Sequence, residues 1–251
     1  MSKKRSDSYK QRLCVAYNCF CEYYKIQWEM PNYQPEERIP RLPTEEQIKI
    51  LIAGAGKSLS LRLRVSLETG LRPIELCNLK AQDLDIEHAA INPTTAKHGC
   101  ARILKISIPL AQDLQTRIIQ HNIKPTENIF GKSTPKHYGT HYREMRKTLA
   151  KKLNKPDLLT IRLYDFRHFF GTMRYWKYRD IPLTAQDMGH KDYNTTSKYL
   201  HLCRILELMT TDDQWICKAV KTKDEAIPLI ETGFQYVNTT PDGFMLYHKH
   251  K

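Results

Sequence analysis

The sequence predicts a mainly α-helical protein with a small antiparallel β-sheet. Apolar residues recur at helical spacing behind clear helix starts, such as the capping pattern that opens at Thr44. The periodicity changes over residues 83–108, where three short strand-like segments follow one another. Near the end of the chain, two more such segments flank the turn sequence Thr-Thr-Pro-Asp-Gly. Together these observations indicate an α+β fold in which helices dominate.

The composition points to a polyanionic partner. The 251 residues include 40 Lys and Arg against 27 Asp and Glu, which gives a formal charge of 40 − 27 = +13. Hydrophobic residues make up 41%, enough for a core. No apolar run approaches the roughly 18 residues of a membrane span, and no signal peptide follows the basic start. The charge predicts a polyanionic partner, either nucleic acid or an anionic membrane surface. Seven scattered cysteines suit reduced thiols, so we expect a cytoplasmic protein.

Residues 1–41 are expected to form a helix and a linker. The stretch 8–24 reads as an amphipathic helix whose apolar stripe comprises Leu13, Ala16, Tyr17, Phe20 and Tyr24. Prolines at 31, 35, 40 and 43 indicate an extended linker, with a domain boundary near residue 42. The helix has basic residues at and before its start: Lys3, Lys4, Arg5, Lys10 and Arg12.

Residues 42–217 are expected to form one domain. Helices are predicted over 44–54, 58–68, 73–80, 112–120, 138–153, 164–177, 182–188 and 194–206. Strands are predicted over 85–87, 90–92 and 103–108. The tail, residues 218–251, reads as a separate unit with a helix over 223–231 and a hairpin.

Five residues stand out for their chemistry. Arg72 lies in TGLRPIEL, Lys97 in the turn before a strand, Arg167 in YDFRHFFGT, and His190 and Tyr199 in MGHKDYNTTSKYLHL. Two arginines can bind a phosphate through forked donors and neutralise its developing charge. A tyrosine hydroxyl can attack phosphorus and form a covalent ester. The leaving sugar oxygen then needs a proton, for which Lys97 is the natural donor.

These motifs resemble the tyrosine recombinases, also called the integrase family, over about residues 42–205. The order of the five residues and the nine-residue step from His190 to Tyr199 both fit the family. The TMRYWKYRDI segment, the IQWEMPNY lead-in and the tail are most similar to archaeal integrases of viruses and plasmids. The resemblance implies the catalytic-domain fold of this family.

The resemblance also implies a role for each residue. Tyr199 is the nucleophile, Arg72 and Arg167 clamp the scissile phosphate, Lys97 protonates the leaving 5′-oxygen and His190 hydrogen-bonds the phosphate. Glu75, one turn after Arg72, is expected to orient the site. The implied chemistry uses no cofactor, ATP or metal. The implied partners are double-stranded DNA and other copies of the chain, as a tetramer on two duplexes.

One position departs from the family pattern. Tyr164 stands where the second box usually begins with histidine, and a phenol is a poor base near pH 7. His168 is expected to support the site but not simply to substitute for the base, because it is rotated ~100° from Arg167 on a helix. This predicts a slower but competent enzyme, in which Tyr164→His raises the cleavage rate.

Other functions stay open at this point. The resemblance implies a DNA-clamping domain before the catalytic one, and the short N-terminal region is expected to be a reduced or partial version of it. Together with Tyr164 it allows a catalytically impaired relative that binds DNA without cutting it. A type IB topoisomerase-like enzyme would share the chemistry, and a basic DNA- or RNA-binding module would explain only the charge.

Overall fold

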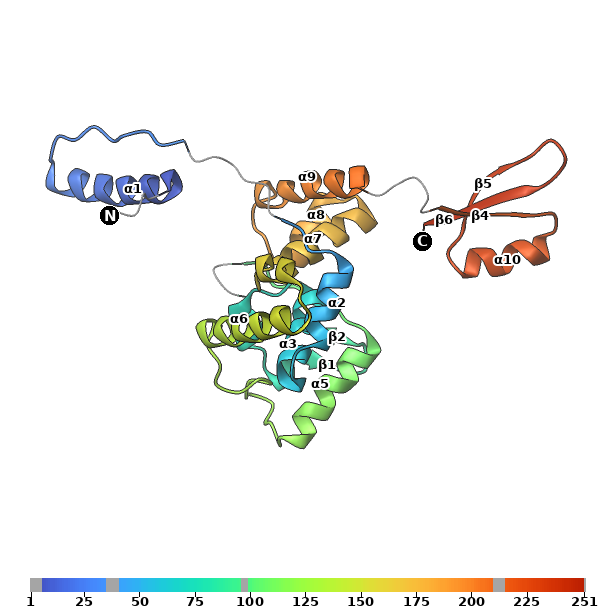
Figure 1. The fold of residues 1–251 in the computed structure, drawn as a ribbon, viewed down its shortest axis with the longest axis horizontal. Helices are drawn as coiled ribbons and strands as arrows, with labels where there is room; N and C mark the ends of the chain where they lie inside the picture. Colours follow the sequence, from blue (N-terminus) through green and yellow to red (C-terminus); the bar gives the residue numbers. More distant parts are fainter. Residues whose placement is uncertain (1–5, 35–40, 96–98, 210–214, 251) are drawn as a thin grey trace. The chain divides into compact units, whose positions relative to one another are not determined.

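The computed structural model of the protein describes residues 6–34, 41–95, 99–209 and 215–250 (Figure 1). The chain consists of two compact units, Met1–Pro40 and Arg41–Lys251. The α-helices are α1 Asp7–Tyr24, α2 Glu45–Ala53, α3 Lys57–Thr69, α4 Pro73–Cys77, α5 Ile108–Gln120, α6 Pro135–Lys152, α7 Asp165–Tyr178, α8 Ile181–Met188, α9 Asn194–Met209 and α10 Lys223–Glu231. The strands are β1 Leu84–Asp85, β2 Ala90–Ile91, β3 Leu104–Lys105, β4 Trp215–Val220, β5 Gln235–Thr239 and β6 Met245–His250. The predicted mainly helical fold with small antiparallel sheets is confirmed.

None of the described helices is both long enough and apolar enough to cross a membrane. Short 3-10 helices over Ala81–Asp83 and Pro156–Thr160 connect longer elements. Helix α2 begins as the sequence predicts, since Thr44 Oγ1 accepts from the Gln47 backbone N–H and the Gln47 side chain accepts from the Thr44 N–H. This reciprocal cap satisfies two N–H groups that the first turn would otherwise leave unpaired.

The first unit contains α1 and the chain that follows it. Its predicted apolar stripe is largely exposed: Leu13, Tyr17 and Phe20 are each about half exposed, and Cys21 is buried instead. The aromatic rings contact one another, with Tyr17 edge-on to Trp28 at a centroid distance of 4.9 Å. A unit of about 40 residues has too little chain to cover a helix face, which explains the difference from the expectation.

The core of the second unit is built on α2, α3, α5 and α6. Leu51, Leu63 and Leu110 are fully buried there, and the rings of Tyr138 and Tyr142 are almost fully enclosed. The Tyr142 hydroxyl donates to Ile161 O at 3.1 Å, which satisfies a buried polar group. This core fixes the ends of α3 and α4, where the first arginine box lies.

The first sheet has the order β1-β2-β3, with both pairs antiparallel. The strand expected over 103–108 is shorter, and the helix expected from 112 begins at Ile108. Ser107 is the reason: its hydroxyl accepts from the Leu110 N–H at 3.4 Å, and Pro109 occupies the first turn. The turn between β2 and β3 includes residues 96–98, which lie outside the described residues.

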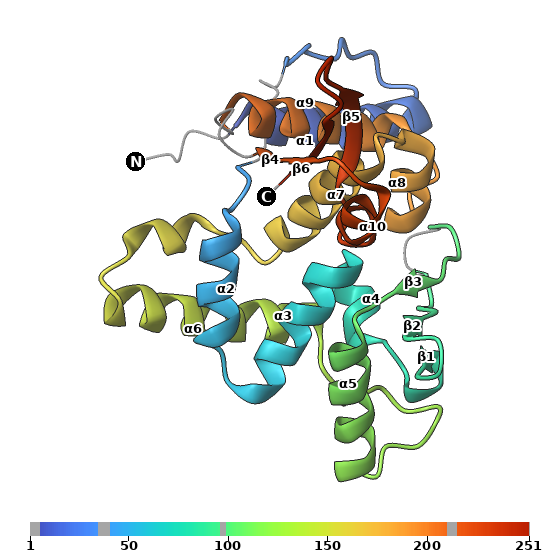
Figure 2. The ribbon, with the colours of Figure 1, turned by 90° about the vertical axis from the view of Figure 1, so that its right-hand side faces the viewer.

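Helices α7, α8 and α9 pack together at one end of this core, as two views show (Figures 1 and 2). Helix α7 contacts α3, α8 and α9. Gly70 ends α3 in the left-handed conformation (φ 59°), where a side chain would also meet the ring of Phe170. This close approach brings the first arginine box against α7.

The last residues form a second sheet with the order β4-β6-β5. Helix α10 and the hairpin match the predicted tail, but β4 was not predicted and starts before residue 218. It exists because Trp215–Val220 pairs along the whole of β6. Ala226 and Leu229 of α10 pack on Phe234 and Tyr247, which gives the tail a small core of its own.

Candidate active site

Arg72 lies at the start of α4 and is held by a buried carboxylate. Its backbone N–H donates to Glu75 Oε2 at 2.9 Å, and its Nη1 donates to Glu75 Oε1 at 2.8 Å. Arg102 Nη2 donates to Glu75 Oε2 at 2.9 Å. Burial favours the neutral form of Glu75, but Arg102 and Arg72 outweigh it and keep its pKa below the usual value. Glu75 therefore stays ionised and holds two guanidinium groups.

Arg167 is the largest fully buried side chain and belongs to α7. Its Nη1 donates to Gly70 O at 2.5 Å and its Nη2 to Met188 O at 2.6 Å, so it joins the ends of α3 and α8. Burial and the nearby charge of Arg72 lower its pKa, and an arginine stays charged nonetheless. Among the described residues, its Nε has no hydrogen-bond partner. A buried guanidinium with a spare donor is suited to an anion.

His190 follows α8 and contacts Arg167. Arg167 Nη2 donates to His190 Nε2 at 3.0 Å, and His190 Nδ1 lies 2.8 Å from Thr196 Oγ1. Because a guanidinium only donates, Nε2 accepts and Nδ1 carries the ring proton. Burial and the charge of Arg167 lower the pKa of His190 to about 3. The ring is therefore neutral at pH 7, and an anion that engaged Arg167 would free Nε2.

Tyr199 lies in α9 and is almost completely buried. It packs on Met188 and Leu202, and α7 approaches so closely that a Cβ at Gly171 would lie 2.7 Å from Tyr199 Cζ. Burial raises the pKa of its hydroxyl, while the charges of Arg167 and Arg72 act in the opposite direction. The hydroxyl is therefore protonated at pH 7 and lies within the field of both arginines.

Tyr164 and His168 lie on one face of the start of α7. Their rings meet edge to face with centroids 5.1 Å apart. Tyr164 is 40% exposed, whereas the His168 ring is half-buried and its Nδ1 lies 3.4 Å from the Tyr199 hydroxyl. His168 is therefore rotated from Arg167, as its place in the helix predicts, and its ring contacts the Tyr199 hydroxyl.

Two further cationic side chains, which the sequence motifs did not single out, adjoin the site. Arg102 is buried on the far side of Glu75, and its Nε and Nη1 lack hydrogen-bond partners among the described residues. Lys198 Nζ lies 5.3 Å from the centre of the Tyr199 ring. Burial, Arg167 and Arg72 lower the pKa of Lys198. Neither lies at a position that the sequence motifs marked, so only the fold could reveal them.

The remaining candidate residues are Lys97 and five basic residues near the start of the chain. Lys97, Lys3, Lys4 and Arg5 are outside the described residues. In the first unit, Lys10 Nζ donates to Asp7 Oδ1 at 2.8 Å and Arg12 Nε donates to Ser8 O at 3.2 Å. Both pairs are local contacts along α1.

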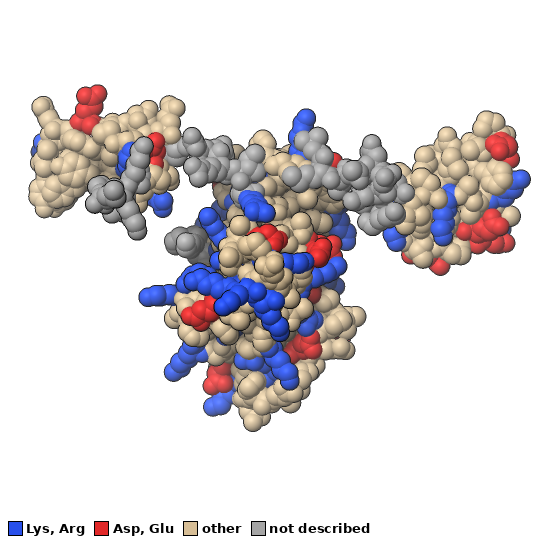
Figure 3. All heavy atoms as spheres, viewed as in Figure 1, with Lys and Arg blue, Asp and Glu red and all other residues tan. Residues whose placement is uncertain are grey.

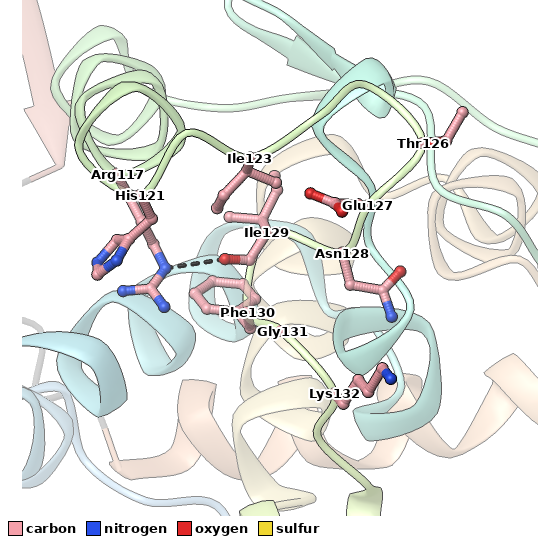
Figure 4. A pocket seen from close by; sticks show the side chains of 10 residues that line it. All are labelled: Arg117, His121, Ile123, Thr126, Glu127, Asn128, Ile129, Phe130, Gly131 and Lys132. Atoms are coloured by element: carbon pink, nitrogen blue, oxygen red, sulfur yellow. Dashed lines mark hydrogen bonds between the residues drawn. The ribbon is translucent and has the colours of Figure 1, made fainter.

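A pocket of about 480 Å³ lies between the end of α5 and residues 123–132 (Figure 4). It shares no lining residue with the cluster around Tyr199. Arg117 Nε donates to Ile129 O at 2.9 Å and so fixes one wall. A second pocket, of about 430 Å³, is lined by His190 together with Cys100, Asp180 and Tyr193. Of these two pockets, only the second adjoins the cluster of Arg72, Arg167, His190 and Tyr199.

Comparisons with known proteins agree with this geometry. Residues 42–204 match the phage integrase family. The chain is 31% identical over 174 residues to a tyrosine recombinase of Pseudothermotoga lettingae, an alignment that covers 68% of this chain and 59% of that protein. It is 26% identical over 204 residues to tyrosine recombinase XerA of Saccharolobus solfataricus, covering 80% of this chain and 66% of that one. The chain thus spans about three-fifths to two-thirds of the length of these relatives.

The fold is also found among solved structures. The XerH site-specific recombinase, bound to a palindromic difH substrate in a post-cleavage complex, aligns with a TM-score of 0.60 at 17% identity. The alignment covers 81% of this chain and 67% of that one. At this identity the likeness concerns the fold alone, and it confirms the catalytic-domain fold that the motifs implied.

Proposed function

Because the chain belongs to the phage integrase family, we propose that it is a site-specific DNA recombinase that cuts and rejoins double-stranded DNA through Tyr199. The observation that carries the proposal is the meeting of four predicted residues from separate parts of the chain. Arg72, Arg167, His190 and Tyr199 lie in one cluster, and the hydroxyl feels the charges of both arginines. The recombinases that the chain matches support the same reading.

In the proposed reaction, the Tyr199 oxygen attacks the scissile phosphorus. The bond between Oη and phosphorus forms as the bond from phosphorus to the 5′-oxygen breaks. Arg72 and Arg167 neutralise the charge that builds on the phosphate oxygens. His190 donates to the phosphate in the tautomer that carries its proton on Nε2, in which the Thr196 hydroxyl donates to Nδ1. Lys97 supplies the proton that the 5′-oxygen needs. The phosphotyrosine ester conserves the energy of the broken bond, so rejoining requires neither ATP nor a metal.

The surface charge supports DNA as the substrate. Lys and Arg side chains crowd the part of the surface where Figure 1 shows α6 (Figure 3). The exposed basic residues of this helix are Lys136, Arg143, Lys147, Lys151 and Lys152. The XerH relative of known structure is bound to a DNA substrate, difH. We assign residues 42–217 to catalysis, 1–41 to DNA clamping and 218–251 to an appended tail.

Exchange between two duplexes needs an active site at each of four strands. We therefore propose that four copies of the chain assemble on two duplexes. Sedimentation of the protein with a duplex that carries its recovered target site tests this. A complex containing four protomers and two duplexes is expected, and a single protomer per duplex at saturating protein would contradict the assembly.

Covalent trapping tests the proposed reaction. The protein is incubated with a randomised library of nicked duplexes from which the cleaved fragment diffuses away, and DNA attached to denatured protein is sequenced. The wild type should form an adduct enriched in one sequence, and Tyr199→Phe should form none. Tyr193→Phe is the matched control, since Tyr193 is exposed and six positions away. Absence of any adduct, with salt-sensitive binding intact, would instead indicate a DNA-binding relative without cleavage.

A further inference from the structure

The structure places a histidine where it can act on the attacking hydroxyl. His168 lies four positions after Tyr164, and residues at this spacing share a helix face. Its Nδ1 is 3.4 Å from the Tyr199 oxygen. The Tyr164 ring packs edge-on against the imidazole and limits how it can turn.

The Tyr199 hydroxyl needs a proton acceptor in order to attack. Its burial raises its pKa, so almost none of it is ionised at pH 7. A phenol at position 164 does not supply a base near neutral pH. Lys198 Nζ lies over the Tyr199 ring, 5.3 Å from its centre, and no hydrogen bond from it to the hydroxyl is found among the described residues.

We propose that His168 is the catalytic base of this enzyme, accepting the Tyr199 proton through Nδ1 and replacing the histidine that position 164 lacks. The inference rests on the proposed strand cleavage. As the bond from Oη to phosphorus forms, the phenolic proton passes to Nδ1. The electron pair of the breaking bond goes to the 5′-oxygen, which is protonated by the general acid, assigned above to Lys97.

The electrostatic surroundings of His168 fit this role. Burial, Lys198 and Arg167 lower its pKa to about 4, so the imidazole is neutral and free to accept a proton at pH 7. A scissile phosphate bound between the arginines adds negative charge that offsets Lys198 and Arg167. The imidazole then becomes a stronger base at the moment of attack. The contact of 3.4 Å is longer than a strong hydrogen bond, as is common for catalytic contacts before substrate binds.

The test is single-turnover cleavage of a nicked duplex that carries the target site recovered by trapping. His168→Ala and His168→Asn should cleave about 10²-fold to 10⁴-fold more slowly than the wild type, the usual range for loss of a general base. His141→Gln is the matched control, because His141 is an exposed histidine on α6. DNA affinity and thermal midpoint are measured for each variant, so that misfolding is recognised.

Two further measurements separate a base from a structural histidine. Added imidazole should restore cleavage by His168→Ala, because a small base can occupy the vacated space. A substrate with sulfur in place of the bridging 5′-oxygen needs no acid, since a thiol has a pKa of ~8.5. This substrate should rescue Lys97→Ala and leave the His168 variants slow.

The outcomes distinguish the two proposals. If the wild type forms no adduct at Tyr199, the proposed function is wrong and the inference about His168 falls with it. A wild type that cleaves normally while His168→Ala stays within threefold of it overturns the inference alone. A loss that imidazole does not restore, in a variant that folds and binds DNA, also overturns it. If His168 is the base, Tyr164→His should change the rate by less than tenfold.

Discussion

At the residue scale, the site depends on charges that are buried in pairs. Glu75 lies between Arg72 and Arg102 and is inaccessible to solvent. Removing one partner of such a group leaves a buried charge unpaired. The free energy of unfolding then falls by more than the intact ion pairs contribute to it. The catalytic geometry and the stability of the fold therefore depend on the same carboxylate.

Glu75→Ala should lower the unfolding free energy by about 3–5 kcal/mol, and Glu75→Gln by less, because the amide still accepts one hydrogen bond. The pKa of Glu75 is lower in the folded chain than in the unfolded one. Its contribution is thus present above the unfolded pKa of ~4.3 and is lost as the pH falls through the folded value. Urea denaturation at pH 7 and pH 3 checks this, and an equal effect at both pH values would contradict it.

His190 should also make stability fall at acid pH, over a window that begins at a higher pH than that of Glu75. Its pKa is about 3 in the folded protein and ~6.5 in the unfolded chain. Between these values the unfolded chain binds one more proton, so stability falls as the pH drops, by about 1.4 kcal/mol per unit. His190→Asn should remove this contribution between pH 4 and 6 and leave that of His168, whose pKa is also lowered, to about 4. Denaturant titrations measure it, and an unchanged slope would show that His190 is not buried as a neutral ring.

The charge of Lys198 should influence the pH below which the cleavage rate falls, which is the acid limb of the pH–rate profile. The groups that face His168 are Tyr164 and Arg167 on α7 and Lys198 and Tyr199 on α9. Lys198 is one of the charges that lower the pKa of His168, so Lys198→Met should raise that pKa and move the acid limb to higher pH. Single-turnover rates between pH 4 and 7 measure the limb. A limb that stays in place or moves to lower pH would contradict this account.

At the scale of elements, the packing of α7 on α9 positions the nucleophile. Gly171→Ala would place a methyl group 2.7 Å from Tyr199 Cζ and 2.5 Å from Met188 Sδ. Overpacking of this kind costs about 1–3 kcal/mol, and here it also displaces the attacking oxygen, so cleavage should slow as stability falls. Gly139→Ala on α6 is the control, since its nearest neighbour is Arg143 Nη1 at 3.4 Å. Gly139→Ala should stabilise the helix by about 0.5–1 kcal/mol. Slower cleavage by this control would contradict the claim that the effect of Gly171→Ala comes from displacing Tyr199.

At the scale of the whole molecule, the formal charge of +13 should dominate binding to nonspecific DNA. A protein that makes 6–10 phosphate contacts loses about 10³-fold to 10⁵-fold in affinity between 50 and 200 mM salt. Fluorescence anisotropy of a labelled duplex of random sequence measures the slope. Charge reversal along α6, for example Lys147→Glu with Lys151→Glu, should weaken binding and flatten the slope. Binding that is independent of salt would contradict DNA as the partner.

The sequence alone predicted the fold class and most helices, and it singled out Arg72, Arg167, His190 and Tyr199, which the structure brings together. Local signals carried these predictions, such as the cap at Thr44, the strand pattern before Lys105 and the boxes around Arg72 and Arg167. Strand β4 could not be found this way, because its residues become a strand only by pairing with β6, which follows 25 residues later.

Only the tertiary structure decided which side chains meet. Helix geometry predicts that the side chain of His168 points away from that of Arg167. The packing of α9 on α7 nevertheless brings the Tyr199 hydroxyl to the His168 ring. In the same way, Arg102 and Lys198 join the site through contacts between elements that no local pattern records. Spacing along one helix fixes the relation of its own residues, whereas the packing of two helices depends on every side chain between them, here down to the missing side chain of Gly171.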